Sequence, residues 1–528
     1  MTREISRDPK TPTSVDVRAS AREPVTDPTL GIRVIKVVPN GPAKHRLVTI
    51  GDSLTQGFQS GAVHNTELSY PRLIAKELGW AEEFRFPRYP GAGGLPLNIE
   101  FIVRRLERSF GDRIDWWQAP AAALKLRSVM DEIEDYWERG PGATPPSNPA
   151  IHHNLSVYAW DLRDALSRTA GICASEIGTP HDDLLLQVVE SANARAALRV
   201  LPPVGRGPAG GMGLLDSAEA LGGDGEIETL IVMLGANNAL GTIVELKVVW
   251  SKEGYDDLEK KSAFTVWDPV HFEKELRLLA ARVKKIRARH VIWCTVPHVT
   301  IAPLARGVGS KIAADSRYFP FYTRPWILDH DFNRDEDPNI TAAEARAIDA
   351  AIDQYNDAIV AVVREARSDR GDARDWFVFE TAGLLDRLAQ RRYIDSPPAR
   401  PPWWTPYELP AALQALTPVP NSRFFASGPT GRTSGGLFSL DGVHPTTVGY
   451  GILAQELIRV MELAGVKFYA ADGSLRRSPV NVDFSALLGE DSLLRDPPPS
   501  FTSDLGLLGW LDRAADVVGL GRMTLPLT

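Results

Sequence analysis

The feature that most constrains the fold of this chain is a series of short, β-branched apolar runs separated by residues with helical periodicity. The runs lie at residues 46–50, 229–234, 290–296 and 376–379. Amphipathic stretches typical of helices lie at residues 70–78, 121–138, 272–289, 341–366 and 446–463. Strands that are apolar throughout must be covered on both faces. We therefore expect a three-layer α/β/α sandwich with a mainly parallel central sheet.

The length of 528 residues permits several domains or one large domain with insertions. We expect the polar, proline-containing residues 1–30 to form a flexible arm. Residues 31–470 would form the α/β domain, with insertions at about 84–150 and 241–430. Residues 471–528 would form a tail with an amphipathic helix docked on the body. Contact of that helix with a membrane surface is the alternative, although the usual basic face is missing.

Composition excludes some partners and leaves others open. A net charge of −8 argues against nucleic acid as the main partner, because phosphate binding needs a basic face. The two cysteines, Cys173 and Cys294, are expected to be buried thiols rather than a disulfide framework. No apolar leader opens the chain, and no run reaches the roughly 18 apolar residues of a membrane span. These features predict a cytoplasmic protein.

Three polar clusters stand where an expected strand ends or an expected helix begins. Gly51-Asp52-Ser53 follows the first strand, and Asn237-Asn238 follows the second. Asp441 and His444 stand three residues apart before the helix at 446–463. Each cluster alone is compatible with an ordinary turn or helix cap. Together they could supply a nucleophile, an oxyanion donor and an oriented base at one edge of the sheet.

In this order, the clusters resemble the GDSL/SGNH hydrolase family of lipases and esterases. The opening block is Gly51-Asp52-Ser53-Leu54-Thr55-Gln56-Gly57, and the closing block is Asp441-Gly442-Val443-His444-Pro445 followed by Gly449-Tyr450. The resemblance covers these blocks between Val48 and about Leu463, with long unmatched stretches between them. It implies a flavodoxin-like arrangement of the sheet and hydrolysis of carboxylic esters through an acyl-enzyme.

The resemblance also implies a role for each matched residue. Ser53 would attack the acyl carbonyl, His444 would act as the base, and Asp441 would orient His444. The oxyanion would be held by the Ser53 N–H, the Asn237 side chain and the N–H of Ala159. The side chains would supply all the chemistry, so no metal or organic cofactor is expected. The expected substrate is a small-molecule or lipid ester.

Three departures from the family pattern concern the oxyanion donors. The second block normally reads Asn-x-(Gly/Ala)-Val-x-Gly and here reads Asn154-Leu155-Ser156-Val157-Tyr158-Ala159. Ala159 can replace the final glycine if its φ is negative, and is penalised if φ is positive. Ser156 replaces a Gly or Ala, and Asn238 stands where the family often has Asp. An acyltransferase with the same residues, or a catalytically silent fold that acts as a binding module, are the alternative functions.

Other residues are weaker candidates. Asp52, Asn238 and His298 are candidates for lining the substrate site, because each follows an expected strand. Two aromatic, proline-containing stretches at 318–326 and 401–407 are where we expect the acyl or alcohol pocket. The Gly-x-Ser-x-Gly elbow of the α/β-hydrolases is excluded, because Thr55 occupies the position of its second glycine.

Overall fold

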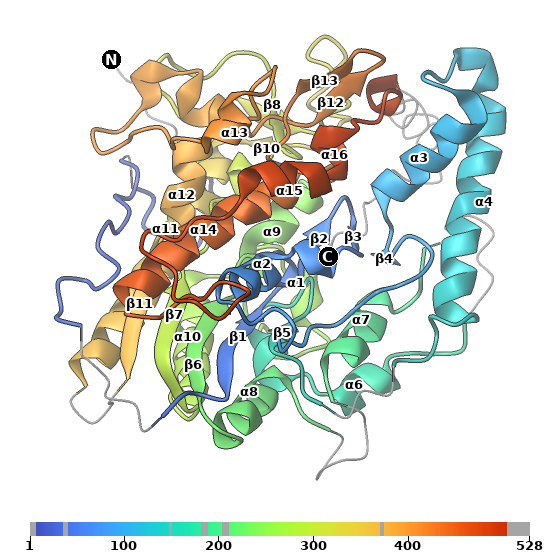
Figure 1. Ribbon diagram of the computed structural model, residues 1–528. Helices are drawn as coiled ribbons and strands as arrows, with labels where there is room; N and C mark the ends of the chain where they lie inside the picture. Colours follow the sequence, from blue (N-terminus) through green and yellow to red (C-terminus); the bar gives the residue numbers. More distant parts are fainter. Residues whose placement is uncertain are drawn as a thin grey trace.

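A computed structural model describes residues 7–18, 20–34, 41–146, 150–180, 188–202, 211–369 and 374–503. Its centre is a five-stranded parallel sheet (Figure 1). The strands, in chain order, are β1 (His45–Gly51), β5 (Asn154–Ser156), β6 (Ile227–Met233), β7 (Ala288–Cys294) and β11 (Asp375–Phe379). The predicted α/β class with a parallel central sheet is confirmed.

The strand order β11-β7-β6-β1-β5 determines where a ligand can reach the sheet. Numbered within this sheet alone, the order from the other edge is 2-1-3-4-5, which is the flavodoxin-like doubly wound order. The chain reverses direction across the sheet between β1 and β6. Sites in such folds lie beyond the carboxyl ends of the strands at this reversal. Ser53 follows β1 and Asn237 follows β6, so both residues lie at that position.

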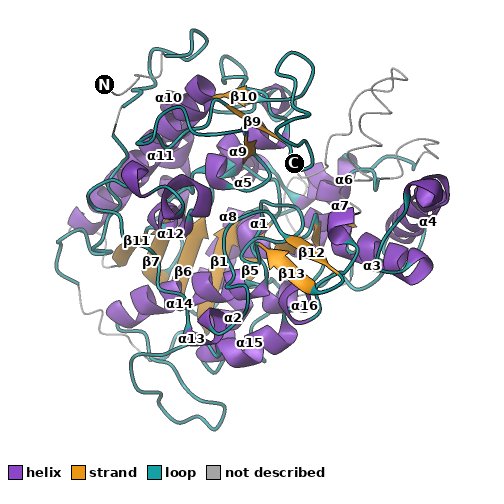
Figure 2. Ribbon diagram, turned by 90° about the horizontal axis from the view of Figure 1, so that it is seen from above, coloured by secondary structure: helices purple, strands orange, loops and turns teal. Residues whose placement is uncertain are grey.

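Alternate residues of each strand enter two separate cores, which makes the sheet the middle of three layers. Val48 and Trp293 belong to one core, whereas Leu47 and Ile292 belong to the other. The first core packs under α8 (Leu214–Gly223), α10 (Pro269–Val283) and α11 (Ala342–Ser368). The second packs under α2 (Tyr70–Glu77), α12 (Thr381–Leu388) and α14 (Thr447–Leu463). Figure 2 shows α10 and α11 on one side of the sheet and α2 and α14 on the other.

The remaining elements are short or surround this frame. They comprise α1 (Ser53–Gln56), β2 (Phe58–Gln59), β3 (Ala62–Val63), β4 (Leu95–Pro96), α3 (Ile99–Phe110), α4 (Ala119–Glu138), α5 (Leu162–Ser167), α6 (Ala170–Ser175), α7 (Ala192–Val200), α9 (Asn237–Val244), β8 (Arg306–Gly307), β9 (Phe321–Thr323), β10 (Ile340–Thr341), α13 (Ala411–Gln414), β12 (Ala426–Gly428), β13 (Gly431–Ser434), α15 (Phe484–Glu490) and α16 (Ser492–Arg495). β2, β3 and β4 form one small antiparallel sheet, and β8, β9 and β10 form another.

The expected insertion at 241–430 is not a single segment. β7, β11 and their helices α10 and α11 lie inside this range and belong to the central sandwich. The added chain is divided among the connections that follow α9, β7 and α12. Within the expected insertion at 84–150, α3 and α4 pack against each other and stand at the margin of the molecule (Figure 1).

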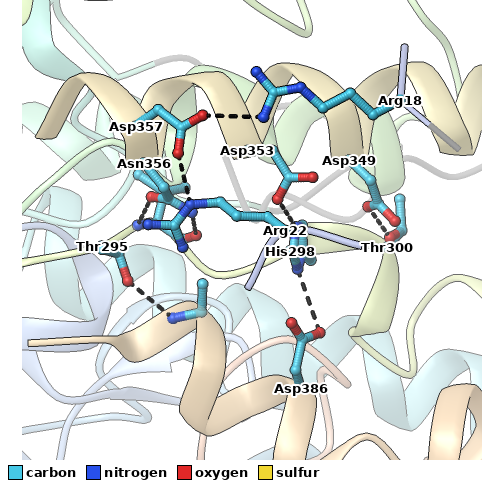
Figure 3. A network of polar contacts seen from close by, with 12 residues as sticks. Arg18, Arg22, Thr295, His298, Thr300, Asp349, Asp353, Asn356, Asp357 and Asp386 are labelled. Atoms are coloured by element: carbon cyan, nitrogen blue, oxygen red, sulfur yellow. Dashed lines mark hydrogen bonds and ion pairs between the residues drawn. The ribbon is translucent and has the colours of Figure 1, made fainter. Parts of the chain in front are cut away.

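The N-terminal segment is bound to the body over residues 7–18 and 20–34, which differs from the flexible arm expected for residues 1–30. Arg22 makes ion pairs with Glu380 at 2.8 Å and with Asp357 at 2.9 Å. Figure 3 shows Arg22 crossing below α11, which carries Asp357. The segment is irregular because its prolines and charges prevent regular structure, yet these ion pairs attach it to α11 and to the end of β11.

Two findings concern the tail and membranes. α15 packs against α14, so the described part of the tail is docked on the body. The apolar residues 505–518, which we expect to form an amphipathic helix, lie outside the described residues. In the described parts of the chain, every helix is too short or too polar to cross a bilayer. Cys173 and Cys294 are buried free thiols, as expected.

The contacts of the N-terminal segment predict unequal effects for two arginines on it. Arg22→Ala should lower the free energy of unfolding by about 1–3 kcal/mol, because Glu380 loses its buried cation. Arg18→Ala should lower it by at most about 0.5 kcal/mol, because Arg18 is half-exposed and its ion pairs are screened. Urea unfolding of both variants measures the difference. Equal effects would mean that the segment is not attached through Arg22.

Candidate active site

Ser53, His444 and Asp441 form a hydrogen-bonded chain beyond the end of β1. His444 Nδ1 lies 3.0 Å from Asp441 Oδ2, and His444 Nε2 lies 2.9 Å from Ser53 Oγ. The bond to the carboxylate places the ring proton on Nδ1, so Nε2 can accept the hydrogen of the Ser53 hydroxyl. All three side chains are buried, with Ser53 5% exposed. The structure therefore brings together the three residues that the sequence selects.

The Asp441 carboxylate is held by donors from two distant segments. Oδ1 accepts hydrogen bonds from the backbone N–H groups of Val443 and His444, at 2.8 and 2.9 Å. Oδ2 accepts one from Gly61 N–H at 2.9 Å in addition to the imidazole. Burial alone would raise the pKa of Asp441, but His444 and these bonds lower it below its ordinary value. The carboxylate therefore stays ionised and fixes the ring of His444.

The hairpin of β2 and β3 supports the base from the other side, a role that sequence reasoning missed. Ser60 N–H donates to Ser439 Oγ at 2.8 Å, and Leu440 N–H donates to Ser60 Oγ at 3.3 Å. The Phe58 ring packs on the imidazole of His444, with ring centroids 4.4 Å apart. The hairpin therefore restrains both the carboxylate loop and the imidazole. Two-residue strands give no periodic signal, although Gly57 and Gly61 indicate turns here.

The turn that carries Ser53 is tightly packed. A Cβ at Gly51 would lie 2.0 Å from Thr55 Oγ1, so only glycine fits there. Asp52 caps α1 through a 3.1 Å bond from Leu54 N–H to its Oδ1. Its Oδ2 has no hydrogen-bond partner among the described residues. Burial raises the pKa of Asp52 to about 7. Asp52 is 1% exposed, as His444 is, and its role in lining the substrate site stays a prediction.

Three hydrogen-bond donors follow strand ends that lie in register. Gly51 of β1 pairs with Met233 of β6 and with Ser156 of β5. Ser53, Asn237 and Ala159 lie a few residues beyond the ends of β1, β6 and β5, respectively. Asn237 Nδ2 donates one hydrogen to Trp160 O at 2.9 Å, which leaves its second hydrogen for a ligand. Within the described chain, the N–H groups of Ser53 and Ala159 donate to no other group. All three residues can therefore serve as oxyanion donors.

The backbone at Ala159 is left-handed, with φ of 62°. This is the conformation in which alanine is penalised relative to glycine, so the substitution is strained. The preceding residue, Tyr158, is held on both sides: its N–H donates to Gln56 Oε1 at 2.7 Å, and its carbonyl oxygen accepts a bond from Asn193 Nδ2 at 2.5 Å. These contacts hold Ala159 in the strained conformation with its N–H unused.

The side chains of Asn238 and His298, two candidates for lining the substrate site, are both buried and hydrogen-bonded within the protein. Asn238 is fully buried, and its Oδ1 accepts a 3.4 Å bond from Leu162 N–H at the start of α5. His298 is 3% exposed and lies between Asp353 at 2.9 Å and Asp386 at 3.3 Å (Figure 3). Burial alone would lower the pKa of His298, but these two carboxylates raise it to about 10. His298 is therefore the cation of a structural ion-pair cluster.

An apolar cavity of about 100 Å³ is lined by sequence neighbours of Ser53 and His444, although these two residues do not line it themselves. Leu54 follows Ser53 in sequence, and Val443 and Pro445 flank His444; all three line the cavity. The other walls come from α12, α14 and the segment at Leu437 and Phe438. Neither aromatic stretch, 318–326 or 401–407, contributes to it. Trp404, in the second stretch, is buried and donates to Asp386 O at 2.8 Å.

Neither similar proteins nor metal-binding side chains indicate the function of this site. The chain matches no family model, no curated protein and no solved structure in the comparisons. Within the described ranges, no group of three or more His, Cys, Asp or Glu side chains is placed to hold a metal ion. The arrangement of Ser53, His444 and Asp441 is therefore the evidence for the function.

The raised pKa of Asp52 predicts a pH-dependent stability. The unfolded chain releases this proton near the ordinary value of 3.8, whereas the folded protein holds it up to about 7. Folding stability therefore falls as the pH rises between these values. Asp52→Asn removes this loss, so its stability relative to the wild type should increase with pH, by up to about 4 kcal/mol above pH 7.

Urea unfolding between pH 4.5 and 8 measures this trend. The Asp335→Asn variant is the matched control, because its carboxylate lies at the surface. An advantage of Asp52→Asn that is equal at pH 4.5 and 8, or that shrinks as the pH rises, would contradict the raised pKa.

Proposed function

We propose that this protein is a serine hydrolase that cleaves carboxylic esters. The observation that carries the proposal is the 2.9 Å contact between Ser53 Oγ and the Asp441-bound imidazole of His444. It lies at the reversal point of a doubly wound sheet, where ligands of this fold class bind. The resemblance of the sequence blocks to the GDSL/SGNH family supports the same function.

The side chains of the site can carry out each step of ester hydrolysis. As Ser53 Oγ attacks the ester carbonyl, His444 Nε2 takes the hydroxyl proton, and the oxygen that becomes negative accepts bonds from Asn237, Ala159 and Ser53. The C–O bond to the alcohol then breaks, and His444 returns the proton to the leaving oxygen. Water, deprotonated by the same imidazole, releases the acid and regenerates Ser53. Asp441 stabilises the imidazolium in both halves of the reaction.

The apolar cavity favours an acyl group with a short hydrocarbon chain. Its walls are apolar apart from Thr381 and Ser422, so a hydrocarbon chain fits there better than a sugar or a charged group. Its volume of about 100 Å³ is small compared with the roughly 300–1,000 Å³ of pockets for drug-sized ligands. We therefore expect short acyl chains to react best.

One alternative is transfer of the acyl group to an alcohol. Ser53 and His444 are 5% and 1% exposed, so an acceptor alcohol that binds beside them could compete with water for the acyl-enzyme. Transfer would use the same attack on the ester and would differ only in the second nucleophile. A catalytically silent binding module is less consistent with the site, because it does not require a hydroxyl, an imidazole and a carboxylate in hydrogen-bonded sequence.

Hydrolysis of p-nitrophenyl esters from acetate to palmitate tests the proposal. The wild type should hydrolyse the short esters, and Ser53→Ala should reduce kcat by at least about 1,000-fold, because the nucleophile is lost. Ser262→Ala, at an exposed serine, is the control and should keep full activity. Hydrolysis that survives Ser53→Ala would overturn the assignment. Turnover that needs an added alcohol would favour transfer, and no turnover would favour a silent fold.

A further inference from the structure

A second cavity, of about 330 Å³, is lined by five arginines. We call it the arginine cleft; its cationic side chains are Arg306, Arg317, Arg391, Arg392 and Arg423. They come from four separate segments that meet between the β8–β9 sheet and the connection after α12. The chain as a whole carries a net charge of −8, so this concentration of positive charge opposes the overall balance.

Carboxylates pair with only three of these arginines. Arg306 pairs with Asp329 at 2.5 Å, Arg392 with Asp349 at 2.8 Å, and Arg423 with Asp395 at 2.6 Å. Among the described residues, Arg317 and Arg391 form no ion pair. Arg391 donates one hydrogen bond, to Gly307 O at 2.8 Å. Asp349 also attracts Arg317 and raises its pKa, whereas burial and the neighbouring Arg306 and Arg423 lower the pKa of Arg391. Arg391 is therefore the cation of the cleft whose surroundings disfavour its charge.

The surroundings disfavour a positive charge at Arg391 and at the neighbouring Lys311. Arg392 is 5% exposed, and its second terminal nitrogen has no hydrogen-bond partner among the described residues. Lys311 lies beside the cleft and donates to Arg392 O at 2.6 Å. Burial and the neighbouring arginines lower the pKa of Lys311 to about 8. Cations that crowd together in a partly desolvated cavity are stabilised when an anion binds between them.

The shape of the cleft suits an anion with several oxygens. The Arg391 guanidinium lies over the Phe319 ring, 4.7 Å from its centroid, and this contact restrains it. A planar guanidinium held in this way can donate two parallel hydrogen bonds to a phosphate group.

The cleft also adjoins the candidate active site. Ser422 lines both cavities, and Leu304 N–H donates to Gly442 O, between Asp441 and His444, at 3.0 Å.

We propose that the arginine cleft binds a phosphate group, through the unpaired guanidinium groups of Arg391 and Arg317. The phosphate can belong to the ester that reacts at Ser53, or to a separate small molecule. The site is inferred from the cleft alone and stands whether or not Ser53 is a nucleophile.

Isothermal titration calorimetry of the full chain with pyrophosphate, in a phosphate-free buffer of fixed ionic strength, tests the site. Pyrophosphate should bind to the wild type, and Arg391→Gln should raise the Kd by about 10-fold or more, because a bidentate charged contact is lost. Arg277→Gln removes a half-exposed arginine on α10 and is the matched control; it should bind as the wild type does. Ser53→Ala should also bind normally, which separates this test from that of the proposed function.

Hydrolysis of lysophosphatidic acid and of the monoacylglycerol with the same acyl chain distinguishes the two sources of phosphate. If the substrate carries it, the wild type prefers lysophosphatidic acid and Arg391→Gln loses that preference. If the wild type shows no preference but binds pyrophosphate through Arg391, the phosphate belongs to a separate ligand.

Two results would overturn the site: no binding of pyrophosphate by the wild type at millimolar concentrations, or equal binding by the wild type and Arg391→Gln. Thermal unfolding establishes that the variant is folded. If it is not, Arg317→Gln provides the same comparison with the second unpaired arginine.

Discussion

The four hydrogen bonds to the Asp441 carboxylate are the contacts on which the candidate site depends. Three of them lie within the loop before α14, and the fourth, from Gly61 N–H, joins this loop to the hairpin that follows Ser53. Because the same carboxylate holds the imidazole, the position of His444 relative to Ser53 follows from this one junction. The sheet supplies the other requirement, since the register of β1 with β5 and β6 aligns the residues that follow the three strands.

Several features of the site oppose stability and are held by their surroundings. Ala159 is left-handed, the buried carboxyl of Asp52 has an oxygen without a partner in the described parts of the chain, and Ser53 is almost fully buried. Strain and buried polar groups of this kind persist only where surrounding contacts enforce them, and they concentrate at functional sites. The extra segments of the chain supply many of these contacts. Asn193 fixes the peptide beside Ala159, and Leu304 binds the loop of His444.

The parts of the fold that were predictable from sequence are those with strong local periodicity. Four sheet strands and the helices α2, α4, α10, α11 and α14 follow from apolar patterns, whereas α3 was missed among the prolines and glycines that precede it. Ser53, Asp441 and His444 follow from polar clusters beside the predicted elements. β5 has only three residues, so no periodic pattern marks it. The buried contacts of Asn238 and His298 were not predictable, because a polar residue after a strand can face a buried partner instead of solvent. The arginine cleft was not predictable, because its side chains come from four segments that only the tertiary structure brings together.

The central claim is that Ser53 is a nucleophile activated by His444. Labelling with a fluorophosphonate, followed by mass spectrometry of the peptides, measures this directly, because the reagent reacts with an activated serine regardless of the natural substrate. Labelling of Ser53 in the wild type, and its loss in His444→Ala, is the expected result. A label on another serine, or equal labelling of Ser53 without His444, would contradict the claim.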